Sequence, residues 1–137
     1  MRGVIVTLAL AGATAVGPAA AQGVMGAADA RRTFFGIDME GVHQPSGLRW
    51  RECIDPQGRT TYWFAETIDQ GVLTVRDDGA LCFAYASRGY QDKACWRIRP
   101  QGRGVYRFEH ADGESGVFVT TSTRRVRVCQ GADTPMS

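Results

Sequence analysis

The fold is decided by residues 72–86, which read VLTVRDDGALCFAYA. Apolar side chains alternate with other side chains on both sides of Asp78-Gly79, and an Asp-Gly pair between two alternating runs is a strong signal for a tight hairpin turn. In the second run Leu81 and Phe83 face the same way, because side chains alternate across a strand. The stretch therefore predicts a β-hairpin.

The same alternation, interrupted by turn residues, continues in both directions from this hairpin. Glycine or proline punctuates the chain roughly every eight to twelve residues, a spacing typical of all-β proteins. Short connections favour an antiparallel meander of about eight strands, and closure into a small barrel or a flattened sandwich would hide the sheet edges. A barrel of this size is expected to be filled by side chains. We expect strands over residues 48–54, 59–66, 72–76, 80–86, 94–99, 105–110, 116–121 and 124–130.

Residues 1–21 have the features of a signal peptide. Arg2 supplies a positive start, residues 4–16 are mostly apolar, and the segment from Pro18 to Gln22 contains an Ala-x-Ala cleavage site. We therefore expect an exported protein, periplasmic or secreted. No later apolar run approaches the ~18 residues of a membrane-spanning helix, so no membrane span is expected.

The rest of the chain divides into three parts. Residues 22–36 are expected to form a flexible N-terminus and a short helix, capped by Asp29 and ended by Gly36. Residues 37–131 are expected to form the β domain, and residues 132–137 are expected to form a frayed tail.

The charge balance of the chain bears on its partners. The chain has 137 residues, with 16 Lys and Arg against 14 Asp and Glu, so its formal net charge is +2. A balance this close to neutral argues against a nucleic-acid partner. All basic residues except Lys93 are Arg and the chain has no Asn, a skew that a GC-rich bacterial genome produces through codon usage. The abundance of Arg is therefore weak evidence for function.

The four cysteines are expected to form two disulfides, because an exported chain meets an oxidising compartment. Four cysteines allow three pairings. Cys82 and Cys95 flank a turn-rich segment and lie in expected strands, so we favour a bridge between them, which leaves Cys53 and Cys129 to join the first and last strands. The chain has no Cys-x-x-Cys motif and neither histidine has finger-like spacing to a cysteine, so no metal site and no cofactor are expected.

Residues 35–96 resemble a group of small exported proteobacterial proteins that are classed as a domain of unknown function. Turn and core residues dominate the shared pattern, which covers about half of the chain that follows the signal peptide. The resemblance implies an exported β domain with a Cys82–Cys95 bridge, and it carries over no catalytic residue. The likeness rests on Phe35-Gly36, GVLTV at 71–75, Asp78-Gly79, LCFAY at 81–85 and Cys95-Trp96.

Arginines recur at every second position of the later strands and form a candidate anion-binding stripe. Arg97, Arg99 and Arg107 share the face opposite the aromatic side chains, and Arg125 and Arg127 extend the stripe if the barrel closes. Guanidinium groups in such a row could hold a phosphate, a sulfate or a carboxylate. The plainer interpretation, which the codon skew favours, is a solvated outer face that discourages edge pairing.

The two histidines are the next candidates for chemistry. His110 shares the aromatic face with Tyr106 and Phe108, so we expect it to be a buried, hydrogen-bonded side chain. His43 is expected in a solvated loop that contains Gly, Pro and Ser.

Two acidic patterns also have plain structural explanations. Glu52 and Glu66 could act as an acid and a base, but a contact between one of them and an Arg such as Arg51 is the better explanation. Asp77-Asp78-Gly79 lacks the repeated acidic positions of a calcium loop, and a hairpin turn accounts for it.

These patterns favour a non-catalytic, monomeric domain that binds an envelope partner or a small anionic ligand, through its loops or through the Arg stripe. The alternative is a small periplasmic enzyme with a site in the barrel mouth near His110, Tyr106 and Glu109. A concave pocket with a titrating histidine is what an enzyme requires, whereas a binding domain can have a filled interior.

Overall fold

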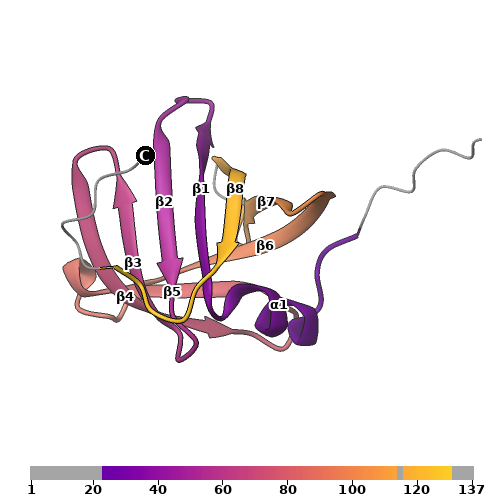
Figure 1. The fold of residues 1–137 in the computed structure, drawn as a ribbon, viewed down its shortest axis with the longest axis horizontal. Helices are drawn as coiled ribbons and strands as arrows, with labels where there is room; N and C mark the ends of the chain where they lie inside the picture. The colour runs from indigo at the N-terminus through magenta and orange to yellow at the C-terminus, as the bar shows by residue number, and fades with distance from the viewer. Residues whose placement is uncertain (1–22, 114–115, 131–137) are drawn as a thin grey trace, which may run out of the picture.

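The computed structural model describes residues 23–113 and 116–130, which form a closed antiparallel β barrel (Figure 1). Within these ranges there are eight strands, each paired with the next in the chain and the last paired with the first. The expected all-β meander and its closure into a barrel are confirmed. The expected signal peptide and the tail at 132–137 lie outside the described residues. The strands are β1 (Ile37–Gln44), β2 (Arg49–Ile54), β3 (Arg59–Phe64), β4 (Thr67–Val75), β5 (Leu81–Tyr85), β6 (Lys93–Gly102), β7 (Val105–His110) and β8 (Val117–Arg125).

Strand β1 was not among the strands expected from sequence. Ile37 and Met39 are 4% and 1% exposed and belong to the core, and they alternate with acidic residues on the other face. The alternation then breaks at Gly41, where the register with β8 shifts at a bulge. Charged residues, a glycine and a bulge interrupt the alternation of apolar residues that predicts a strand.

The two strands expected at 116–121 and 124–130 are a single strand, β8, and this corrects the sequence prediction. The polar half of β8 pairs with β1, so the backbone ladder continues the strand where apolar alternation stops. Residues 126–130 belong to no strand. The Val126 amide donates to the Gly36 carbonyl at 3.0 Å, and the chain then crosses in front of β2 and β3 (Figure 1).

Both expected disulfides are present. Cys82 of β5 lies directly opposite Cys95 of β6, with 4.0 Å between their Cα atoms. Cys53 of β2 is joined to Cys129, with 5.7 Å between their Cα atoms. Cys129 lies beyond the last strand rather than within it, so the second bridge holds the segment that follows β8 against the outside of the barrel.

Helix α1 (Ala27–Phe34) closes one end of the barrel. Ala30 and Phe34 lie one turn apart on the helix and are both fully buried. The Phe34 ring lies 5.1 Å from the Tyr106 ring and 5.6 Å from the Phe108 ring. The Met25 amide, just before the helix, donates to the Ile98 carbonyl at 2.8 Å. These contacts fill the barrel at the end where β1 begins.

The start of α1 differs from the expectation. Gly26 is the N-cap, and Asp29 lies in the first turn, where it pairs with Arg32. The two alanines before Asp29 favour an earlier start, and a carboxylate in the first turn suits the helix dipole. The helix ends before Gly36, whose φ of 76° is left-handed, as expected. No helix in the described part of the chain is both long and apolar enough to cross a membrane.

Candidate ligand-binding site

A cavity of about 440 Å³ occupies the barrel at the end opposite α1. Met39 and Phe108 line its deep part. Ser87 and Arg88 of the 3-10 helix η1 (Ala86–Arg88), together with Asp92, are exposed and line its mouth. The cavity therefore runs from the core to solvent, which corrects the expectation of a filled interior.

Aromatic side chains form the wall of this cavity. They follow the strands, so that Tyr62 stacks on Phe64 at 6.1 Å and Phe83 stacks on Tyr85 at 6.0 Å. Rings that pack against their neighbours along the wall leave the middle of the barrel open, which is why the interior is not filled. The eight aromatic residues of the wall are Trp50, Tyr62, Phe64, Phe83, Tyr85, Trp96, Phe108 and Phe118.

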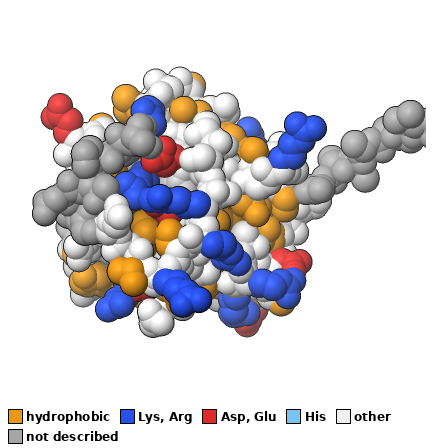
Figure 2. All heavy atoms as spheres, in the orientation of Figure 1, with side chains coloured by type: hydrophobic (Ala, Val, Ile, Leu, Met, Phe, Trp, Pro, Cys, Tyr) orange, Lys and Arg blue, Asp and Glu red, His pale blue; other side chains and the backbone are white. Residues whose placement is uncertain are grey.

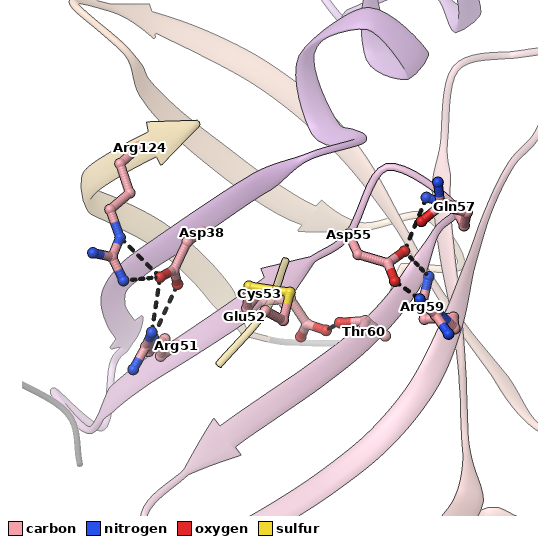
Figure 3. Close-up of a disulfide and its surroundings, with 10 residues drawn as sticks. Asp38, Arg51, Glu52, Cys53, Asp55, Gln57, Arg59, Thr60 and Arg124 are labelled. Carbon is pink, nitrogen blue, oxygen red and sulfur yellow. Dashed lines mark hydrogen bonds and ion pairs between the residues drawn. A yellow bond between two sulfur atoms is a disulfide. The ribbon is translucent and has the colours of Figure 1, made fainter. Parts of the chain in front are cut away.

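Of the carboxyl groups in the described residues, that of Glu52 lies inside this aromatic wall. Glu52 is 4% exposed, and its Oε2 accepts a hydrogen bond of 2.8 Å from the Tyr85 hydroxyl. Its Oε1 accepts from the Thr60 hydroxyl (Figure 3). The expected contact between a glutamate and Arg51 is therefore wrong for Glu52, because successive residues of β2 point to opposite faces of the sheet. The alternation of Trp50, Glu52 and Ile54 on one face was the sequence signal for this buried position.

Burial changes the protonation of the polar groups in the cavity. Desolvation raises the pKa of Glu52 well above its usual value, and it outweighs the hydrogen bond from Tyr85, which acts in the opposite direction. Desolvation and the charge of Glu52 also raise the pKa of the Tyr62 and Tyr85 hydroxyls. The cavity therefore presents two phenol hydroxyls beside a carboxyl group, and burial shifts all three groups toward their neutral forms.

The mouth of the cavity is held by contacts between η1 and β4. Asp69 of β4 accepts a hydrogen bond of 3.2 Å from the Ser87 amide and a second one from the Ser87 hydroxyl. Arg88 and Asp92 complete the charged rim. These contacts fix the connection between β5 and β6 at the side of the opening.

His110 is the member of the expected enzyme site that lines the cavity. Its ring lies 4.8 Å from the Trp96 ring, and its Nδ1 accepts from the Asp112 amide at 3.4 Å. Tyr106 contacts Phe34 at the opposite end of the barrel, and Glu109 faces outward. The structure therefore does not bring His110, Tyr106 and Glu109 together.

His43 does not lie in a solvated loop, which corrects the second expectation for the histidines. It is a half-buried residue of β1, and its ring lies 5.7 Å from the Phe64 ring and 4.6 Å from the Phe118 ring. Its Nδ1 lies 2.7 Å from the Ser46 hydroxyl. The missed strand β1 explains this error.

The Arg stripe is divided between several structural contacts. Arg99 and Arg107 both bind Glu109, at 3.0 and 3.1 Å. Arg125 donates to three carbonyl groups around the end of α1, while Arg97 and Arg127 are exposed. Figure 2 shows Lys and Arg side chains spread over the viewed face in several separate places. An anion site on these five residues stays a prediction.

The cluster of charges that sequence reasoning missed lies on the outer wall. Asp38 of β1 binds Arg51 of β2 and Arg124 of β8, as Figure 3 shows. The guanidinium of Arg51 also lies 4.7 Å above the Trp63 ring. Only the register of β1 with its two neighbours brings these side chains together, so the sequence carried no local signal for them.

A scan against protein-family models, a search of curated proteins and a search of solved structures each found no match to this chain. The resemblance to small exported proteobacterial proteins stays a prediction.

Proposed function

We propose that this protein is an exported, non-catalytic β barrel of the bacterial envelope that binds a small molecule inside the barrel. The observation that carries the proposal is the cavity of about 440 Å³, lined by aromatic side chains and open to solvent at one end. Sites for small molecules typically measure ~300–1,000 Å³ and combine an apolar wall with a few placed polar groups. Glu52, Tyr62 and Tyr85 are such polar groups.

Export is supported by the signal-peptide features of residues 1–21 and by the two disulfides. Disulfides persist in oxidising compartments such as the periplasm and the medium. The barrel is closed at one end by α1 and is crosslinked by two disulfides, so we expect it to be rigid. A rigid binding site loses little conformational entropy when a ligand binds.

The cavity is a better candidate than the Arg stripe for holding the ligand. Arg99 and Arg107 already share the Glu109 carboxylate, and Arg125 is committed to backbone carbonyls. A ligand on the stripe would have to compete with these partners, whereas the cavity offers space that no described side chain fills.

A small periplasmic enzyme is the second candidate, and one observation favours it: His110 lines the cavity. Tyr106 faces α1 and Glu109 faces the outer surface, so neither expected partner lies beside His110. An enzyme would need other catalytic groups, whereas a binding protein needs none.

The test uses N-phenylnaphthylamine, an apolar dye whose fluorescence rises in a dry site. We expect saturable binding by the wild type and at least about tenfold weaker binding, or 1.4 kcal/mol, by Ala94→Trp, because Ala94 lines the cavity and an indole would fill it. Val72→Trp is the matched control, since Val72 is 41% exposed on β4. Dye binding that is absent, or that Ala94→Trp leaves unchanged, overturns the proposal.

A further inference from the structure

The charged side chains of the cavity are unevenly distributed. Glu52 lies in the interior, while Asp69, Asp92 and Arg88 lie at the mouth. Arg88 is exposed to solvent. Among the described residues that line the interior there is no Lys or Arg, so the Glu52 carboxyl faces hydroxyl groups and aromatic rings rather than a basic side chain.

The contacts of Glu52 permit both of its protonation states. When Glu52 is ionised, the Thr60 and Tyr85 hydroxyls can both donate to it. When Glu52 is protonated, it can donate to the Thr60 oxygen and still accept from Tyr85, because hydroxyl hydrogens rotate. Ionisation of Glu52 therefore breaks neither hydrogen bond. The ionised carboxylate still has no cation beside it among the described residues, and burial of an unpaired charge is unfavourable in free energy.

The wall around Glu52 also favours positive charge. The faces of aromatic rings carry negative potential, and they attract ammonium groups most strongly when water is excluded. The Tyr62 and Tyr85 rings lie 5.5 Å apart beside Glu52, and the Trp50 ring lines the same cavity. A carboxylate surrounded by rings is complementary to an organic cation and repels an anion.

We propose that the ligand of the barrel is a small organic cation, an arylalkyl- or alkylammonium compound, whose charged nitrogen pairs with Glu52 while its apolar part contacts the aromatic wall. This inference rests on the proposed function and names its ligand class. It differs from the anionic ligand expected for the Arg stripe, because the charge inside the barrel has the opposite sign. The volume of the cavity suits a compound of one or two rings.

The experiment compares three probes of similar shape by displacement of N-phenylnaphthylamine at pH 8: phenethylammonium, phenethyl alcohol and hydrocinnamate. We expect the ammonium to bind at least about tenfold more tightly than the alcohol, a difference of 1.4 kcal/mol, and hydrocinnamate to bind more weakly than the alcohol. Glu52→Gln should remove the preference for the ammonium, so that the ammonium and the alcohol bind with similar affinity. Glu66→Gln is the control, because Glu66 is an exposed carboxyl in the turn between β3 and β4.

A second measurement, on the wild type, keeps the proposal testable if Glu52→Gln does not fold. The ratio of ammonium to alcohol affinity should rise with pH as Glu52 ionises. The other titratable or charged groups around the cavity are Tyr62, Asp69, Tyr85, Arg88, Asp92 and His110. His110→Gln should keep the rise with pH, whereas Glu52→Gln should remove it.

The outcomes separate the two proposals. If the dye binds but the ammonium and the alcohol displace it equally, the ligand class is wrong and the binding function stands. A ratio that is flat with pH in the wild type, or a rise that disappears in His110→Gln, also overturns the role of Glu52. If the dye does not bind at all, the proposed function falls together with this inference.

Discussion

Asp38 and Arg51 form a buried, two-pronged ion pair between β1 and β2. Arg51 Nε lies 2.9 Å from Asp38 Oδ1, and Arg51 Nη2 lies 2.8 Å from Asp38 Oδ2. The two side chains are 3% and 4% exposed. Arg124 of β8 binds the same carboxylate. A single carboxylate of β1 therefore connects both neighbouring strands at the seam where the barrel closes.

Replacement of Asp38 by Asn should lower the free energy of unfolding by ~3–5 kcal/mol, because it removes the carboxylate that binds the buried Arg51 guanidinium at two points. Urea denaturation followed by tryptophan fluorescence measures this change. Asp29→Asn is the control: its ion pair with Arg32 is exposed, so the change should stay below about 1 kcal/mol. A loss in Asp38→Asn no larger than in the control would contradict the structural role of the pair.

The same ion pair predicts how stability changes in acid. Burial pushes the pKa of Asp38 upward, but the hydrogen bonds and charges of Arg51 and Arg124 outweigh it and hold the pKa below its usual value. The unfolded state then binds the proton more readily than the folded state, so the stabilisation is complete above the usual pKa of aspartate and is lost as the pH falls through the lowered value. The melting temperature of the wild type should therefore fall more steeply than that of Asp38→Asn below about pH 4. Parallel curves would disprove this linkage.

Glu52 predicts a pH dependence of the opposite sign. Burial raises its pKa well above the usual value, so above that usual value the folded state holds a proton that the unfolded state has lost. Stability therefore decreases as the pH rises from the usual pKa of glutamic acid toward the raised one. Glu52→Gln removes this loss, and its free energy of unfolding should exceed that of the wild type by more at pH 8 than at pH 5. Equal differences at the two pH values would show that Glu52 titrates normally.

The two disulfides should contribute unequally to stability. The Cys53–Cys129 bridge spans 76 positions and the Cys82–Cys95 bridge spans 13. In the chain-entropy model the longer loop contributes ~4.5 kcal/mol and the shorter one ~3 kcal/mol. The double variants Cys53→Ser/Cys129→Ser and Cys82→Ser/Cys95→Ser test this order by urea denaturation under non-reducing conditions. A larger loss for the shorter bridge would show that packing, rather than loop closure, dominates.

Most of the fold could be predicted from the sequence, but little of the candidate binding site could. Turn residues such as Asp78-Gly79 and the alternation around Phe83 are local signals, so the hairpins, the fold class and the Cys82–Cys95 bridge were predictable. The Cys53–Cys129 bridge followed only as the remaining pair. Strand β1 was missed because its alternation breaks at Gly41, and the split of β8 arose because its second half is polar. In both strands the backbone pairing with a distant partner, and not side-chain alternation, determines the structure.

The cavity could not be predicted because it depends on how rings from six strands pack around the barrel. Glu52 alternates with Trp50 and Ile54, so its inward direction was visible in the sequence. Its partners Thr60 and Tyr85 lie on β3 and β5, and only the closed barrel brings them to the same point. The sequence therefore indicates which side chains face the interior, whereas the volume of the cavity depends on how those side chains pack in the closed barrel.

The bulge at Gly41 has no room for a side chain. A Cβ atom at this position would lie 2.0 Å from the Val119 carbonyl oxygen and 2.8 Å from ring atoms of Trp50. Trp50 lines the cavity and is 3% exposed, and its indole N–H is buried without a hydrogen-bond partner in the described part of the chain. Because Gly41 has no side chain, the Trp50 indole can pack directly against β1.

Gly41→Ala should lower the free energy of unfolding by ~1–3 kcal/mol or more, because either the β1–β8 pairing or the indole has to move. If the indole moves toward the interior, binding of N-phenylnaphthylamine weakens as well. Gly23→Ala is the control, since a Cβ atom there meets nothing within 4 Å. Thermal unfolding and dye titration of the two variants separate the effects: a stable Gly41→Ala protein with unchanged dye binding would mean that Gly41 does not position the wall of the cavity.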